Sequence, residues 1–135
     1  LRVKLQLYEL LLDLHQRSLW EKADSSGRRE AGKIKEILIF LQGNIGGHMQ
    51  VEQIAERFGM SKYHFCRFFK KYSGQTLVEY RNRLKITYAA SLLEQGGRSV
   101  TEVALECGFD NLSYFIRTFK GMTGKTPGQY ELSRR

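Results

Sequence analysis

Apolar positions recur along most of the chain at the three- and four-residue spacing of amphipathic helices. The spacing predicts one helix over residues 1–20, with two apolar stripes, and another from Lys33 to near Gly43–Asn44. Between them, residues 21–32 lack apolar periodicity and contain Gly and Ser, so we expect a linker there. Two stripes are too much apolar surface for a lone helix. We therefore expect residues 1–20 to pack on a second copy, on a preceding domain or on the rest of this chain.

The second half of the chain contains one pattern twice, about fifty residues apart. Nine residues recur in pairs: Ala55 and Ala104, Gly59 and Gly108, Phe65 and Phe115, Arg67 and Arg117, Phe69 and Phe119, Lys70 and Lys120, Gly74 and Gly124, Thr76 and Thr126, Tyr80 and Tyr130. The offset is 49 residues up to the first glycine pair, Gly59 and Gly108, and 50 after it, so the second copy has one extra residue in its turn. A repeat of this size indicates one supersecondary unit used twice.

The repeated unit has the pattern of a helix-turn-helix. In the first copy, over residues 51–73, Ala55 is small enough for two helices to cross closely. Gly59 can adopt a positive φ at low cost, which suits the turn. Ser61 can cap the second helix by accepting a backbone N–H bond, and Phe65 can fill the space beneath that helix.

The second copy, over residues 100–122, has matching signals at its helix ends. Ser99 can cap its first helix, with Glu102 three residues on as a capping box, and Asp110 or Asn111 can cap its second. Pro127 then suits the first position of a last short helix.

A long helix connects the two units, capped by Thr76 and ending near Gln95. At about 1.5 Å per residue it is ~30 Å long, close to the ~34 Å between successive major-groove faces on one side of DNA. The predicted fold is therefore all-α. It comprises two helix-turn-helix subdomains joined by a long central helix and preceded by an N-terminal amphipathic helix.

Charge narrows the choice of partner. The chain carries 22 basic and 14 acidic residues, and residues 33–135 contain 16 of the former and 9 of the latter. A basic excess placed on the repeated region favours an anionic partner such as nucleic acid.

Other classes of protein lack support in the sequence. The longest apolar runs fall short of the ~20 residues of a membrane span, and we expect no membrane partner and no signal peptide. The two cysteines, Cys66 and Cys107, form no ligand cluster with the three histidines, so we expect reduced thiols in a cytoplasmic protein without metal or cofactor. The sequence also shows no recognisable pair of catalytic acid and base residues, so we expect that the protein is not an enzyme.

The repeated residues resemble the AraC/XylS family of bacterial transcription regulators. The second unit matches through ALECGFDNLSYFIRTFK, from Ala104 to Lys120, and then through Gly124, Thr126, Pro127 and Tyr130. The first unit matches through AERFG, FCRFFK and YRNR, which begin at Ala55, Phe65 and Tyr80. The resemblance covers roughly residues 33–132. One departure is Glu131, where the family often has Arg.

The resemblance implies a function and its partners. Residues 33–135 would be the DNA-binding domain, with each second helix entering a major groove on one face of double-stranded DNA. It also implies a sensor or dimerisation domain before this part. The chain begins with Leu1 rather than Met, so we expect it to be a fragment, with residues 1–20 as the last helix of that domain. The other implied partners are RNA polymerase and a second copy of the protein. We expect the protein to be an activator of transcription.

The helix faces separate core positions from DNA-facing positions. The phenylalanines at i, i+4 in each second helix should point into the core. Outward residues are then expected to contact bases: Tyr63, Cys66, Arg67, Leu112, Ser113, Ile116 and Arg117. A further set is expected to contact the DNA backbone: Ser61, Lys62, Lys70, Lys71, Asn111 and Lys120. Arg67 is the strongest candidate for a guanine, because its two N–H groups match O6 and N7.

Two alternatives stay open at this point. Arg67 and Arg117 could instead form structural ion pairs with Glu56 and Glu106. The whole domain could be a helical protein-interaction module, with its phenylalanines and residues 1–20 as the binding surface. Recognition of single strands is disfavoured, because the aromatic residues fall on the core side.

Overall fold

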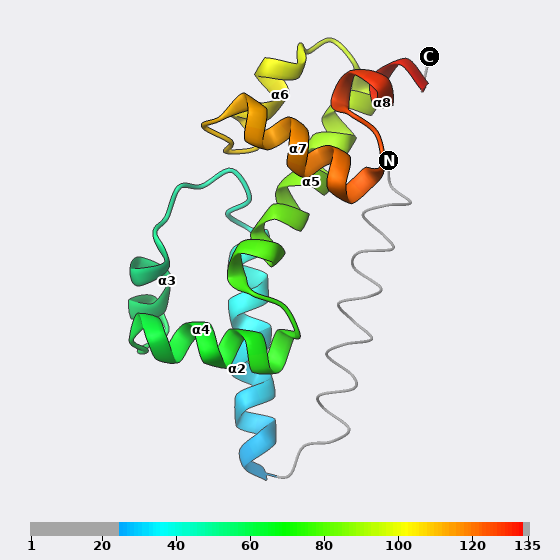
Figure 1. Cartoon of the computed structure of the whole chain (residues 1–135). Coiled ribbons are helices and arrows are strands. Elements are labelled where there is room, and N and C mark those ends of the chain that lie inside the picture. Colours follow the sequence, from blue (N-terminus) through cyan, green and yellow to red (C-terminus); the bar gives the residue numbers. More distant parts are fainter. Residues whose placement is uncertain (1–24, 134–135) are drawn as a thin grey trace.

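The computed structural model describes residues 25–133, and this part of the chain is helical without strands (Figure 1). Its elements are α2 (Ser25–Gln42), α3 (Val51–Arg57), α4 (Lys62–Ser73), α5 (Leu77–Gln95), α6 (Val100–Glu106), α7 (Leu112–Thr123) and α8 (Pro127–Ser133). The predicted all-α architecture, with two helix-turn-helix units around a long helix, is confirmed. The helix predicted over residues 1–20 lies outside the described residues.

The linker predicted over residues 21–32 is wrong for its second part. Helix α2 begins at Ser25, eight residues before the predicted start at Lys33. The early turns lack an apolar stripe, but Glu30 accepts a hydrogen bond from the Tyr72 hydroxyl of α4. The first part of α2 is thus held to a neighbouring helix by a polar contact. The sequence prediction used apolar periodicity alone and could not detect this contact.

Two separate hydrophobic cores divide the described chain. The first is built by α2, α3, α4 and the beginning of α5 as far as Leu84. The second begins at Ile86 and takes in the rest of α5 with α6, α7 and α8. Figure 1 shows α2–α4 gathered around one end of α5 and α6–α8 around the other. The boundary between the two cores therefore falls inside one continuous helix.

The internal repeat extends over four helices in each unit. Tyr80 packs edge-on against Phe69, with ring centroids 5.5 Å apart, and Tyr130 packs in the same way against Phe119 at 5.4 Å. Gln42, at the end of α2, donates to the Tyr80 hydroxyl over 3.3 Å, while the Tyr130 hydroxyl donates to Glu94 at the end of α5. Helix α5 is therefore the last helix of the first unit, where it corresponds to α8 of the second. It is also the first helix of the second unit, where it corresponds to α2 of the first.

The turns follow the predicted backbone geometry. Gly59 and Gly108 have φ values of 70° and 85°, in the left-handed region that glycine adopts without strain. Four residues separate α3 from α4 and five separate α6 from α7, which places the extra residue of the second copy in its turn. Ser61 accepts a bond from the His64 N–H. In the second turn Asn111, not Asp110, is the cap, and its side chain accepts from the Tyr114 N–H.

Candidate nucleic-acid interface

Helix α4 separates its side chains by face as the periodicity predicts. Phe65 and Phe69 have no exposed surface, whereas Cys66, Arg67 and Lys70 are exposed on the opposite side. The buried rings hold the helix against the first core, and the cap at Ser61 sets where it begins. Because the position of the helix is fixed in this way, its exposed face presents basic and polar side chains from a rigid backbone.

A shallow groove of about 790 Å³ runs along this face of α4. Six of the predicted DNA-contacting residues line it: Lys62, Tyr63, Cys66, Arg67, Lys70 and Lys71. The remaining walls come from Val51 of α3 and from residues 76–78 at the start of α5. The structure thus brings all the predicted contacts of the first unit except Ser61 together along one groove.

Arg67 rests on Tyr63, one helical turn earlier. Its guanidinium carbon lies 5.4 Å from the centre of the Tyr63 ring, and Nη1 lies 3.5 Å from the Tyr63 hydroxyl. Such a cation–π contact limits the conformations of the long side chain. Among the described residues Arg67 forms no ion pair with Glu56, so that alternative is not realised. Sequence reasoning named Tyr63 as a base contact and missed its support of Arg67, although the i, i+4 spacing could have indicated it.

Lys62 is already paired in the free protein. Its ammonium lies 3.0 Å from a carboxylate oxygen of Glu52, and the hydrogen bond with Glu52 raises the pKa of Lys62. Both side chains are more than half exposed, where such pairs contribute little to stability. Lys62 can therefore exchange Glu52 for another anion at small cost.

Helix α7 presents a similar face in the second unit. Phe115 and Phe119 are fully buried, and the outward face exposes Ser113, Arg117 and Lys120. Leu112 is 40% exposed at the start of the helix. Glu106, the alternative partner of Arg117, instead forms an ion pair with Arg98 at 2.9 Å.

Two residues of α7 differ from the simple division into inner and outer faces. Ile116, predicted to contact bases, is half-buried and packs against the second core, which leaves only part of its side chain outward. Tyr114 turns toward α5, where Asn82 donates to its hydroxyl over 2.8 Å. The sequence pattern assigned no orientation to Tyr114 and did not identify Asn82.

The two cysteines occupy opposite environments. Cys66 is exposed on the groove face of α4. Cys107 is fully buried in the second core, and burial raises the pKa of its thiol to about 12. Since the thiolate is the reactive form, the thiol of Cys107 is inert near neutral pH.

Residues 25–133 contain no group of His, Cys, Asp or Glu that could hold a metal ion. Within the same residues, every helix is too short or too polar to cross a membrane.

Known proteins similar to this chain share its domain type. A family model described as a helix-turn-helix domain matches residues 54–133. The chain is 36% identical over 100 residues to the HTH-type transcriptional activator AarP of Providencia stuartii, an alignment that covers 74% of each protein. Longer bacterial relatives match at 31% identity over 104 residues, and the chain spans 36% of their length.

Solved structures resemble the two-unit arrangement. One is a transcriptional regulator from Chromobacterium violaceum described as an AraC-type DNA-binding domain-containing protein. It has a TM-score of 0.70 and 27% identity, and the match covers 82% of this chain and 96% of that one. Another is the DNA-binding domain of the global transcriptional factor AdpA, solved in complex with a target DNA. Its TM-score is 0.71 at 27% identity, over 76% of this chain and 92% of that domain. Matches of this extent exceed the length of a single helix-turn-helix.

Proposed function

The chain belongs to the AraC/XylS family of helix-turn-helix transcription regulators, and from this membership we propose that it binds duplex DNA sequence-specifically, with α4 and α7 in two adjacent major grooves. The observation that carries the proposal is the pair of equivalent helix faces. In each unit a buried phenylalanine pair lies on one side of the helix, and an arginine, Arg67 or Arg117, lies on the exposed side without an ion pair to any described residue.

Arginine and lysine divide the work of recognition in this proposal. Arg67 and Arg117 read bases, together with Tyr63, Cys66, Leu112, Ser113 and the exposed part of Ile116. Lysines and helix caps contact phosphates, which fix the register of the protein without reading sequence. This second set comprises Ser61, Lys62, Lys70, Lys71, Asn111 and Lys120.

The alternative of a protein-interaction module is less well supported. That alternative used the phenylalanines as a binding surface. The four repeated phenylalanines have no exposed surface, and they are Phe65, Phe69, Phe115 and Phe119. The AdpA domain, similar in fold and sequence, was solved with DNA.

The remaining partners belong to the same proposal. AarP is a transcriptional activator, and we propose activation through RNA polymerase for this protein too. We also propose self-association through residues 1–20 or through a preceding domain, and a place in the bacterial cytoplasm, where the DNA is. Members of the family are regulators, and we propose no catalytic activity.

Selection of bound DNA from a random pool, with the full chain, tests this function directly. We expect the selected sites to contain two different half-motifs whose centres lie about 10 bp apart, one helical turn. Because both readers lie in one chain, a monomer should occupy both half-motifs in footprinting. Protection of a single groove, or binding only as a dimer to a palindrome, would contradict the proposal.

Thiol labelling tests the placement of α4 on DNA. In the folded protein Cys66 should react with a maleimide, whereas Cys107 should react only after denaturation, because its thiol is buried and its pKa is about 12. Duplex DNA carrying the selected site should slow labelling of Cys66 severalfold, as followed by mass spectrometry. DNA of equal length without the site serves as the control. Unchanged labelling at saturating specific DNA would place Cys66 outside the interface.

A further inference from the structure

The separation of the two cores raises a physical question about the two readers. Along α5, the boundary between the two cores falls between Leu84 and Ile86. A single helix at such a junction can bend and twist, because long helices are rarely straight. Contacts beside α5 must therefore decide how precisely α4 and α7 are oriented relative to each other.

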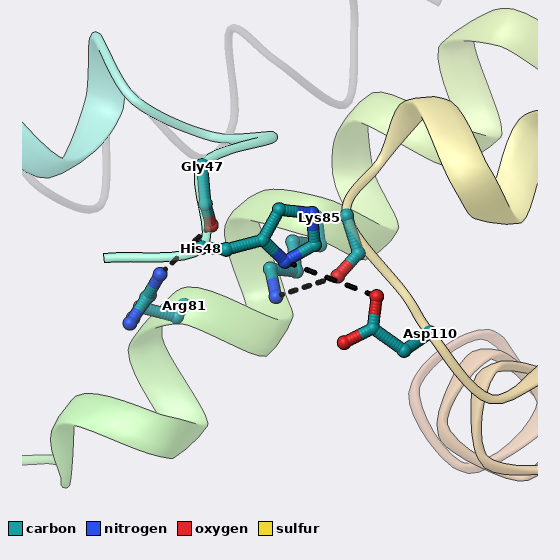
Figure 2. A network of polar contacts seen from close by, with 6 residues as sticks. Gly47, His48, Arg81, Lys85 and Asp110 are labelled. Carbon is teal, nitrogen blue, oxygen red and sulfur yellow. Dashed lines mark hydrogen bonds and ion pairs between the residues drawn. The ribbon is translucent and has the colours of Figure 1, made fainter. Parts of the chain in front are cut away.

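Two cations on one face of α5 hold the loops that flank this junction (Figure 2). Arg81 donates to the carbonyl oxygens of Met49 and Gly47, at 2.8 and 3.0 Å, in the loop that leads into α3. Lys85, one turn later, donates over 3.3 Å to the carbonyl oxygen of Gly108, in the turn between α6 and α7. One helix face thus binds a loop of the first unit and a turn of the second.

The loop and the turn also touch each other directly. A Cβ atom added to Gly46 would lie 2.9 Å from the Glu106 carbonyl oxygen, and one added to Gly108 would lie 3.0 Å from the Gly46 carbonyl oxygen. Beside this contact the side chains of His48 and Asp110 face each other, with His48 Nδ1 3.9 Å from Asp110 Oδ1. Backbone this close leaves no room for a side chain, so the two units are in contact as well as connected.

The environment of the two cations indicates that these bonds are costly to lose. Both side chains are half-buried, and burial lowers the pKa of Arg81 and of Lys85. The Lys85 ammonium also lies 5.2 Å from the centre of the Phe109 ring in the second turn. Cations withdrawn from water need such partners, which favours one fixed arrangement of loop, turn and helix.

We propose that this joint, formed by residues 46–49, residues 106–110 and the Arg81 and Lys85 side chains, sets the spacing between half-motifs that the protein accepts. The inference rests on the proposed binding of both readers to adjacent grooves. Arg81 and Lys85 are then positioning residues, which act through the orientation of α4 and α7.

The geometry of DNA makes the joint's effect measurable. Each base pair added between half-motifs moves the second groove by about 3.4 Å and rotates it by about 35°. Linking two binding sites raises affinity by on the order of 10²–10⁴ only when the link permits both to bind at once. A rigid joint should therefore confine this gain to one spacing, and a loosened joint should spread a smaller gain over several.

The test measures affinity on a series of duplexes in which the two selected half-motifs are moved by one and two base pairs in either direction. Gly46→Ala inserts a methyl group into the joint, and its matched control is Gly43→Ala, whose added Cβ would make ordinary contacts at 3.6 and 3.7 Å. Lys85→Met keeps the stem of the side chain but removes the donor, and Arg83→Met, exposed on the same helix, is its charge-matched control.

We expect Gly46→Ala and Lys85→Met to lose about tenfold in affinity at the best spacing, a modest part of the gain from linking, and to flatten or shift the spacing profile. The two controls should keep the profile of the unaltered protein. Affinity for duplexes with a single half-motif should stay unchanged in all variants, which verifies that each has folded. Unaltered profiles in both joint variants would overturn the inference alone. A flat profile in the unaltered protein would instead overturn two-groove binding and the inference with it.

Discussion

Replacing Phe115 with alanine is expected to lower the free energy of unfolding by about 3–5 kcal/mol, the usual cost of removing a buried ring. The side chain has no exposed surface, and its ring lies 5.0 and 5.8 Å, between centroids, from Phe109 and Phe119. Domains of this size have a total stability of about 5–15 kcal/mol, so the change removes a large share. Chemical denaturation followed by circular dichroism measures it.

The loss should fall mainly on the second unit, because the two cores are separate clusters. Hydrogen exchange is expected to speed up in α7 and α8 more than in α2 and α4. Tyr63→Ala is the control, since this ring is 71% exposed and surface changes usually stay within about 0.5 kcal/mol. An equal loss of protection in both units would show that they unfold as one body.

Replacing Arg67 with alanine is expected to cost about 1–3 kcal/mol in binding and to relax base preference in one half-motif only. Arg117→Ala should do the same in the other half-motif. The reason is that each guanidinium lies on an exposed helix face. In the free protein the Arg67 guanidinium already packs on the Tyr63 ring. Repeating the selection with each variant measures preference position by position.

Lys71→Ala provides the contrast for both arginine variants. A lysine that meets a phosphate should weaken binding to all sequences alike and reduce the slope of log affinity against log salt by about one. If Arg67→Ala lowered affinity evenly across sequences, Arg67 would be a phosphate contact or a structural residue.

Local signals in the sequence were sufficient for most of the fold. Helical periodicity, cap residues such as Ser61 and Asn111, and the two glycines with positive φ all act within a few residues. The internal repeat then indicated that two equivalent units exist. The start of α2 was misplaced because the contact that supports it, between Glu30 and Tyr72, joins residues 42 positions apart.

The site was predictable as two faces but not as a set of contacts. Periodicity placed Arg67 and Arg117 outward, which the structure confirms. It gave no means of seeing that Ile116 is half-buried, since that depends on how α7 tilts on the second core. The joint was also missed, because Gly46 and Gly108 meet only after both units have folded.

The shared helix α5 limits how this protein can be divided or recombined. Its first half, from Leu77, supplies walls of one core, and its second half, from Ile86, supplies those of the other. A cut before Leu84 would remove apolar residues of α5 from the first core, and a cut after Ile86 would remove them from the second. Either reader grafted onto another regulator must therefore carry its own half of α5. Two-part chimeras are best joined between Leu84 and Ile86, so that each parent contributes the half of the helix that its own reader packs against.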